Sequence, residues 1–222
     1  MRLAAPMALA AMAEAPADCS QCPRLVAYRR DNARKHPDWF NAPVPSFGSL
    51  GARLLVIGLA PGVSGANRTG RPFTGDYAGD LLYATLQRFG FARGTYGASK
   101  DDGLELVDCR ISNAVRCVPP ENKPTPEEAT RCRPFLAATF EAMPDLRVVV
   151  ALGRIAHDSA IRALKLKAAA HVFGHAAEHA LPRGVTLIDS YHCSRYNTNT
   201  GRLTQDMFAA VFARAQAITA RT

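Results

Sequence analysis

Short apolar runs alternate with amphipathic stretches along most of the chain from residue 53 onward. Continuous apolar runs of this length are typical of buried parallel strands, and they predict strands at residues 53–59, 104–115, 146–152 and 185–190. Apolar positions at helical spacing predict helices at residues 76–89, 125–143, 154–164 and 204–220. Repeated alternation of strand and helix predicts an α/β fold, a three-layer α/β/α sandwich around a four-stranded parallel sheet.

The helix predicted at residues 125–143 carries the clearest start signal. Thr125 is suited to the N-cap, Pro126 to the first helical position and Glu128 to the third. Gly90 is a stop signal for the first predicted helix. In a parallel sheet covered by helices, ligands bind beyond the carboxyl ends of the strands. The loops that follow the predicted strands are therefore where functional residues are expected.

Residues 1–17 differ in composition from the rest of the chain. They are rich in Ala and Met, and Pro6 interrupts an apolar stretch that is too weak for a secretory signal. We expect a disordered N-terminal extension there and a single domain over residues 18–222, because no repeat or low-complexity linker divides the remainder. No apolar run approaches the roughly 18–20 residues of a spanning helix, which argues against a membrane protein. A cytoplasmic protein is the resulting expectation.

The charge of the chain is unbalanced. Lys and Arg number 27 against 19 Asp and Glu, which gives a net charge of +8 over 222 residues. A surplus of this size favours a polyanionic partner, nucleic acid first and an anionic membrane surface second.

Four of the six cysteines form a candidate ligand set: Cys19, Cys22, Cys117 and Cys132. A C-x2-C pair with two further thiols can build a tetrathiolate cage for zinc or for an iron–sulfur cluster. The alternative is that the last two are buried core thiols. Flanking cations at Arg116, Arg131 and Arg133 favour a cluster, since they help to stabilise a net-negative assembly. The spacing alone does not separate zinc from iron–sulfur.

A long Gly-rich loop follows the first predicted strand, at residues 58–76. Its glycines allow close approach to a ligand, but it lacks the ending of a P-loop and the spacing of a dinucleotide fingerprint. Phe73 offers a ring on which a flat base can stack, or else anchors the loop. Asp76 opens the next helix, where its ordinary role is that of an N-cap.

Two later loops also carry unusual polar residues. Asn113 leaves a strand with a donor and an acceptor side by side, which suits the edge of a base. His192 stands at another strand end, before small polar residues and two arginines that suit phosphate and sugar contacts. The alternative is a solvated surface loop. The other histidines of the C-terminal half show no metal-ligand spacing and are predicted to be helix or surface residues: His157, His171, His175 and His179.

Together these loops resemble the type-b (fifth-family) uracil-DNA glycosylases, in family order and over roughly residues 18 to 215. The matching segments are residues 58–62, 67–76, 113–117, 119–124, 197–198 and 200–204. The four candidate cysteines match the [4Fe–4S] ligands of that family. The resemblance implies a three-layer α/β/α enzyme that flips uracil out of DNA and hydrolyses its N-glycosidic bond, which starts base excision repair. Hypoxanthine and xanthine are further substrates that it suggests.

The resemblance also implies a role for individual residues. Phe73 would stack on the flipped base and Asn113 would read its edge, within a pocket that includes Gly58, Ala60 and Gly62. His192 would hydrogen-bond the uracil oxygen that gains charge, and Asp76 would stabilise the cationic sugar or position the attacking water. The implied DNA-binding residues are Asn67, Arg68, Ser194, Arg195, Asn197 and Arg202. We expect a monomer that acts on DNA in the cytoplasm, associated with the nucleoid.

One position departs from the family pattern. Cys193 follows His192 where the family usually has proline, so the loop gains a free backbone dihedral and an N–H. One alternative function is a catalytically weak or silent iron–sulfur protein that binds damaged DNA. Another is a hydrolase with Cys193 as nucleophile, although adjacent residues on an extended strand point to opposite faces.

Overall fold

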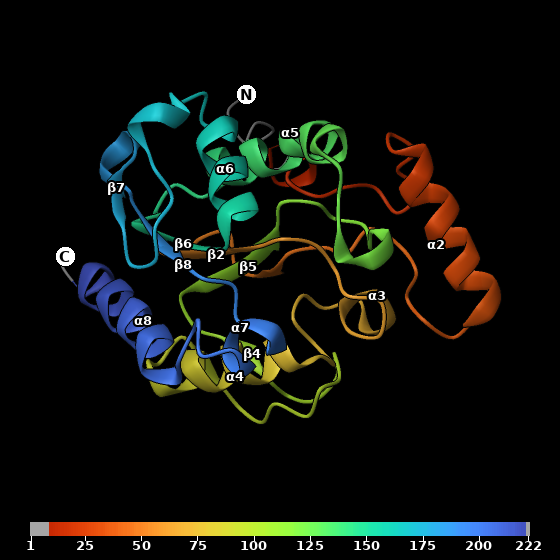
Figure 1. Ribbon diagram of the computed structural model, residues 1–222, viewed down its shortest axis with the longest axis horizontal. Coiled ribbons are helices and arrows are strands. Elements are labelled where there is room, and N and C mark those ends of the chain that lie inside the picture. Colours follow the sequence, from red (N-terminus) through yellow and green to blue (C-terminus); the bar gives the residue numbers. More distant parts are fainter. Residues whose placement is uncertain (1–8, 221–222) are drawn as a thin grey trace, which may run out of the picture.

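A six-stranded sheet lies at the centre of the computed structural model, which describes residues 9–220 (Figure 1). In spatial order the strands are β1 (Phe47–Gly48), β5 (Cys109–Asn113), β2 (Leu54–Gly58), β6 (Val148–Leu152), β8 (Thr186–Ser190) and β7 (Glu178–Ala180). The four inner strands are parallel, and both edge strands pair antiparallel to them. The predicted parallel core is therefore confirmed, but the predicted count of four strands omits the two edges.

The missed strands are short and lie at the edges of the sheet. β1 has two residues and β7 has three, neither long enough to show an alternating pattern in the sequence. The single strand predicted at residues 104–115 is in fact two, β4 (Glu105–Leu106) and β5, with β4 paired to β3 (Ala92–Arg93) in a separate ribbon. Asp108 separates them because its φ of +49° interrupts the extended backbone.

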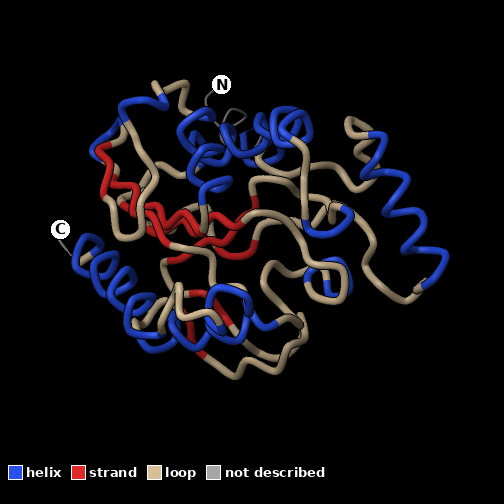
Figure 2. Tube along the Cα trace, in the orientation of Figure 1, coloured by secondary structure: helices blue, strands red, loops and turns tan. Residues whose placement is uncertain are grey.

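Helices cover both faces of the sheet, as Figure 2 shows. Besides the helical residues 9–12, the α-helices among the described residues are α2 (Pro23–Lys35), α3 (Ala66–Thr69), α4 (Tyr77–Arg88), α5 (Pro126–Ala142), α6 (Arg154–Ala163), α7 (Arg195–Asn199) and α8 (Gln205–Thr219). Short 3₁₀ turns occupy Pro120–Asn122, Ala168–Ala170 and Pro182–Gly184. α5 and α6 lie on one face, and α4 and α8 lie on the other (Figure 1). This arrangement confirms the three-layer α/β/α sandwich.

Side chains of the inner strands alternate between the two layers. On β2, Leu54 and Val56 belong to the core shared with α4 and α8, whereas Leu55 and Ile57 belong to the core shared with α5 and α6. All four are fully buried. A strand buried on both faces has a continuous apolar sequence, which is why the pattern of β2 is readable from the sequence.

The predicted capping box at the start of α5 is present. Thr125 Oγ1 accepts a hydrogen bond from the Glu128 N–H at 3.2 Å, and Glu128 Oε2 accepts one from the Thr125 N–H at 2.8 Å. Glu128 also forms an ion pair with Arg24 of α2 at 2.7 Å. The start of α5 is thereby joined to the first turns of α2, an outlying helix that the sequence pattern did not predict.

Part of the predicted N-terminal extension is packed against the domain. Ala13 is fully buried, and the Glu14 carboxylate forms ion pairs with Arg110 at 2.6 Å and Arg116 at 3.0 Å. A buried arginine needs a counter-charge, so these contacts hold residues 13 and 14 in place. Residues 1–8 of the predicted extension lie outside the described residues. Within residues 9–220, no helix is both long and apolar enough to cross a bilayer.

Candidate active site and cysteine cluster

A cavity of about 430 Å³ opens at the carboxyl ends of the inner strands, where the predicted loops converge. Residues from strand ends, loops and helix starts that are distant in the sequence line it: Leu59, Ala60, Gly62, Ala66, Phe73, Asp76, Tyr77, Ala78, Asn113, Asn122, His192, Ser194 and Arg195. The pocket therefore contains most of the residues that the resemblance assigns to catalysis and base binding.

The inner wall of the pocket is built around Gly58. β2 and β5 pair in parallel register so that Gly58 stands beside Asn113. A Cβ at Gly58 would overlap Asn113 Oδ1 and lie 2.5 Å from Phe73 Cζ, so only glycine allows both side chains to approach this strand end. Asn113 is 3% exposed, and its Oδ1 has no hydrogen-bond partner among the described residues. An unpaired buried acceptor at a pocket wall is suited to a ligand that brings a donor.

Phe73 is held at the pocket by its neighbours in the chain. Its φ of +52° is unusual for a bulky residue, and its carbonyl accepts a hydrogen bond from the Tyr96 hydroxyl at 3.4 Å. Arg71 forms a buried ion pair with Asp102 at 2.7 Å, and the Tyr83 hydroxyl donates to the carbonyl of residue 72 at 2.6 Å. These contacts fix the backbone on which the ring stands. The ring lies 6.1 Å from that of His192, at an interplanar angle of 28°.

Asp76 has both its ordinary role and a place in the pocket. Its Oδ1 accepts a hydrogen bond from the Gly79 N–H at 3.1 Å, so it is the N-cap of α4. Its Oδ2 lies against the glycine backbone, 3.1 Å from where a Cβ of Gly62 would stand. Burial raises the pKa of this carboxyl above its ordinary value. One oxygen thus caps the helix, and the other lies against the backbone of Gly62, which lines the cavity together with Asp76.

His192 stands across the cavity, two residues after β8. Asn197 Nδ2 donates to the His192 carbonyl at 2.8 Å, which fixes the backbone of the loop that carries the ring. Burial lowers the pKa of His192 to about 4, so the imidazole is neutral near pH 7. A neutral imidazole with one N–H can donate a hydrogen bond to an oxygen that becomes negatively charged.

Most of the residues predicted to bind DNA are exposed or half-buried, and one of them is buried. Arg68, Arg195 and Arg202 are exposed, and the guanidinium of Arg195 lies 5.2 Å from the centre of the Tyr77 ring. Ser194 caps α7 by accepting from the Asn197 N–H at 3.4 Å. Ser194 and Arg195 line the pocket, and Arg202 lines a neighbouring cavity together with His192.

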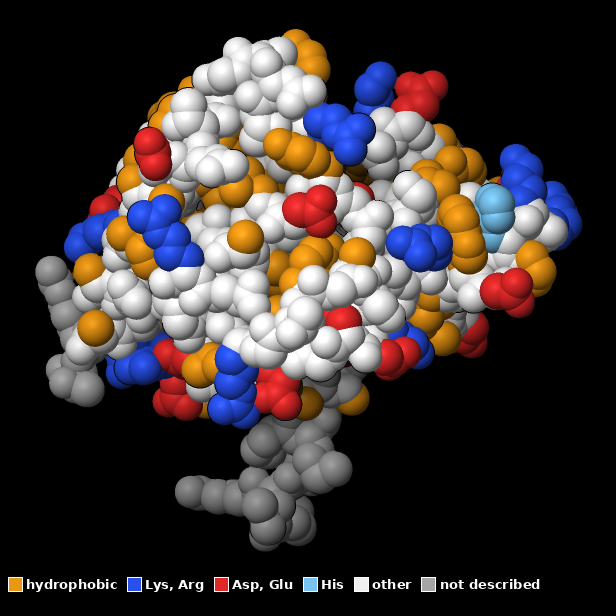
Figure 3. Space-filling view, turned by 90° about the horizontal axis from the view of Figure 1, so that it is seen from below, with side chains coloured by type: hydrophobic (Ala, Val, Ile, Leu, Met, Phe, Trp, Pro, Cys, Tyr) orange, Lys and Arg blue, Asp and Glu red, His pale blue; other side chains and the backbone are white. Residues whose placement is uncertain are grey.

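Asn67 differs from the prediction. It is fully buried, and its Nδ2 donates to Asn41 Oδ1 at 2.9 Å, so the side chain does not reach the surface. The sequence pattern missed Tyr196, whose side chain is 73% exposed on α7. On the face shown in Figure 3, Lys and Arg are interspersed with acidic side chains and do not form one continuous basic patch.

The four predicted cysteine ligands lie together. Cys22 is the N-cap of α2, Cys117 follows β5 and Cys132 lies on α5, yet all three line one small cavity with Cys19. The Arg116 N–H donates to Cys132 Sγ at 3.3 Å. Burial raises the pKa of Cys117 to about 12 and that of Cys132 to about 11, so bare thiolates here need a cationic partner. Four convergent thiols with an N–H donor fit a tetrathiolate metal centre.

Cys193 is not placed to act as a nucleophile. Its side chain is fully buried, and its Sγ lies 3.5 Å from the Ala78 carbonyl. Burial raises the pKa of the thiol, which keeps it protonated. The alternative of a cysteine-dependent hydrolase is therefore unsupported.

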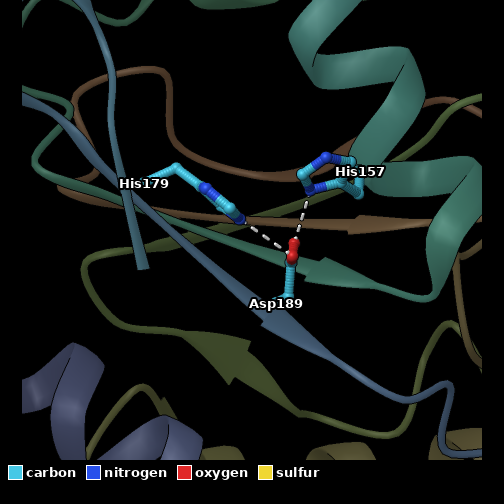
Figure 4. A group of neighbouring side chains, drawn as sticks. All are labelled: His157, His179 and Asp189. Carbon is cyan, nitrogen blue, oxygen red and sulfur yellow. Dashed lines mark hydrogen bonds and ion pairs between the residues drawn. The ribbon is translucent and has the colours of Figure 1, made fainter. Parts of the chain in front are cut away.

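One group of buried polar side chains has no signal in the sequence. His157 lies on helix α6, as predicted, but it is 1% exposed and hydrogen-bonds the fully buried Asp189. His179 contacts the same carboxylate (Figure 4). The three residues are far apart in the sequence, so their spacing gave no signal.

The comparisons with known proteins identify the family. The model of the uracil DNA glycosylase superfamily matches residues 45–216. The chain belongs to this superfamily. It is 46% identical over 203 residues to the type-5 uracil-DNA glycosylase of Thermus thermophilus, which covers 89% of this chain and 92% of that protein. It is 42% identical to the type-5 enzymes of Pyrobaculum aerophilum (90% of this chain, 88% of that protein) and Mycobacterium tuberculosis (89% and 77%).

The resemblance stated from the motifs is confirmed by these matches. A type-4 uracil-DNA glycosylase of Pyrobaculum aerophilum is 34% identical over a shorter stretch, 62% of this chain. The matches with the type-5 branch are thus both longer and higher in identity than this type-4 match.

Proposed function

We propose that this protein is a monofunctional uracil-DNA glycosylase, which hydrolyses the N-glycosidic bond of uracil in DNA as the first step of base excision repair. The observation that carries the proposal is the unpaired, buried Oδ1 of Asn113 beside the ring of Phe73. The N3–H of uracil is a donor that this oxygen can accept, and the flat base fits against the aromatic ring.

The groups around the pocket suit the charges of the reaction. The base leaves with its electron pair as an anion, and the deoxyribose becomes cationic in character. His192 donates an N–H to the uracil oxygen that gains negative charge, and Asp76 provides a carboxylate on the side of the sugar. A water molecule then attacks the sugar, and no lysine lines the described pocket to replace water as nucleophile. Hydrolysis without strand cleavage is therefore expected.

The exposed residues of the two loops that carry Arg68 and Arg195 suit a DNA backbone. Arg68, Arg195 and Arg202 bring positive charge to phosphates, and the exposed Tyr196 offers a ring that can enter the base stack once a nucleotide is extruded. Hypoxanthine and xanthine belong to the proposed substrate range, because they too are deaminated bases with an amide edge that Asn113 can bind. A monomer acting on DNA in the cytoplasm, associated with the nucleoid, completes the proposal.

We propose a [4Fe–4S] cluster at Cys19, Cys22, Cys117 and Cys132, in agreement with the ligands of the family. Such a cluster, when bound, cross-links the start of α2 to α5 and to the segment after β5. Asn113 ends β5, only four residues before Cys117, so the cross-link steadies one wall of the pocket. Analysis of iron and acid-labile sulfide in the purified protein, with Cys22→Ser as comparison, tests the assignment; zinc without sulfide would refute it.

Base release tests the function directly. Duplexes that carry uracil, hypoxanthine or xanthine opposite a normal base are incubated with the protein, and abasic sites are detected by alkaline cleavage, with thymine in the same position as control. We expect release of uracil and none of thymine. Tight binding to the uracil duplex without base release would instead support the silent DNA-binding alternative.

Gly58→Ala is expected to lower the rate of uracil release by up to about 100-fold, because displacement of reacting groups by about 1 Å can have an effect of this size. The added Cβ would push Asn113 and Phe73 apart. Single-turnover rates measure the effect, and Gly51→Ala is the control, since the nearest atom to its Cβ would be 3.6 Å away. An unchanged rate in Gly58→Ala would show that Asn113 and Phe73 do not bind the base in the way proposed.

A further inference from the structure

Three side chains outside the pocket converge between α6, β7 and β8 (Figure 4). His157 comes from α6, His179 from β7 and Asp189 from β8. His157 Nδ1 lies 2.7 Å from Asp189 Oδ1, and His179 Nε2 lies 3.1 Å from Asp189 Oδ2. None of the three lines the proposed active site, and the proposed reaction does not use them. We propose that they form a binding site for one zinc ion.

The charge of Asp189 is the first argument. Its side chain is fully buried, and a carboxylate in that position needs a cation nearby. Among the described residues, its ion-pair partners are the two histidines, and neither Lys nor Arg is one of them. The Gly174 N–H also donates a hydrogen bond to Oδ2 at 3.2 Å. A divalent cation bound by the carboxylate and the two imidazoles would supply that charge in place of a proton on His157.

The orientation of His157 is the second argument. Its Nε2 lies 2.8 Å from the His171 carbonyl and therefore carries a proton. In the neutral ring, Nδ1 then presents a lone pair toward the carboxylate, which also presents lone pairs. Zinc-binding histidines typically donate their second N–H to a backbone carbonyl in this way, which fixes the ring and the tautomer. A cation bound by both His157 Nδ1 and the Asp189 carboxylate removes the repulsion between their lone pairs.

The donor set is the third argument. Two imidazole nitrogens and one carboxylate form a set that zinc accepts, with bonds of about 2.0–2.2 Å. The donor atoms all lie within 4.8 Å of one another, so modest side-chain rotations bring each to bonding distance. They come from a helix and two strands, so the ion would cross-link the far edge of the sheet to the layer above it. No cysteine belongs to this group, which separates the site from the thiol cluster.

The site also borders the segment behind His192. The connection from α6 to β7 places His175 Nδ1 where it accepts the Tyr191 N–H at 3.2 Å, and it packs Phe173 near the ring of Tyr191 at 6.2 Å. Tyr191 directly precedes His192. An ion that fixes this connection therefore supports the backbone next to the proposed active site, although its binding does not depend on the proposed function.

Zinc binding is measured on the full-length protein as isolated, by equilibrium dialysis and elemental analysis. We expect one zinc per chain whose X-ray absorption shows only nitrogen and oxygen neighbours, at about 2.0–2.1 Å, and no sulfur at about 2.3 Å. Asp189→Asn and His179→Gln should each weaken zinc binding by at least about 100-fold, more than the loss of a residue that merely orients a ligand. His179 lies on the edge strand β7, where a substitution disturbs the core less than at Asp189. His179→Gln therefore still tests the site if Asp189→Asn fails to fold.

Two exposed residues provide matched controls, Asp145→Asn and His36→Gln, and neither should change zinc affinity. Zinc should also raise the melting midpoint of the unchanged protein but not that of the two site variants. The proposal is overturned by zinc with sulfur neighbours only, by equal binding in all variants, or by no binding. It is also overturned if magnetic resonance finds both nitrogens of His157 protonated in the presence of zinc, because a proton then occupies the position assigned to the ion.

Discussion

Replacing His192 with glutamine is expected to slow the release of uracil by about 10²–10³-fold, the usual effect of losing one donor to a developing oxyanion. The imidazole faces the ring of Phe73 across the pocket and is neutral near pH 7, because burial lowers its pKa to about 4. A neutral donor does not have to be deprotonated or reoriented as negative charge appears on the base. Glutamine keeps an N–H donor on a flexible chain, so it cannot hold that donor in the same place.

The measurement is single-turnover release from a uracil duplex, together with the affinity for the same duplex. We expect the rate to fall while the affinity changes little, since the lost contact strengthens only as the bond breaks. His175→Gln is an informative control because His175 contacts the backbone of Tyr191 and does not line the pocket. Equal losses in both variants would show that His192 acts through the fold of its loop and not through the base.

The fold could be predicted where the sequence pattern reflects strong local constraints. β2 is buried on both faces, and α5 begins with a complete capping box, so both can be recognised without tertiary information. β1 could not be recognised, because its two residues form a strand only by pairing with β5. The same holds for Glu14, whose order depends on two arginines that are distant in the sequence.

The candidate site could be predicted in outline because parallel strands end at the same edge of a sheet. Gly58 and Asn113 end neighbouring strands in register, so their proximity follows from the topology. Asn67 shows the limit of this reasoning: its motif predicts contact with DNA, but the side chain is turned inward to Asn41. The direction of a side chain in a loop depends on packing that no sequence pattern records.

The group formed by His157, His179 and Asp189 shows the same limit in a different form. Metal-ligand spacing can be detected only when the ligands lie close in sequence or in a known arrangement. Here three elements each contribute one residue, and only the folded chain brings them within 4.8 Å. Asp189 lies within the buried strand predicted at residues 185–190, but the sequence does not show which side chains from other elements surround its carboxylate.

Asp76→Asn separates the two roles of Asp76 and is expected to have an effect at least as large as that of His192→Gln. Asparagine is as good an N-cap as aspartate, so its side-chain oxygen can still accept from the Gly79 N–H and the start of α4 should remain intact. The negative charge beside the sugar is lost, which removes the stabilisation of a cationic sugar and the group that orients water. We expect uracil release to fall by about 10³-fold, with the melting midpoint within error of the unchanged protein.

The pH dependence of the rate shows whether Asp76 acts through its negative charge or only as the N-cap of α4. Burial raises the pKa of this carboxyl, so the active, ionised form is lost as the pH falls through that raised value, and the rate of the unchanged protein should fall with it. Asp76→Asn should lack this acid limb. Asp80→Asn removes an exposed acid in the first turn of the same helix and should keep the rate and the limb, with the limb displaced to lower pH because the charge of Asp80 also raises the pKa of Asp76. If Asp76→Asn remains fast with an unaltered pH profile, the carboxylate only caps α4, and water must be oriented by another group.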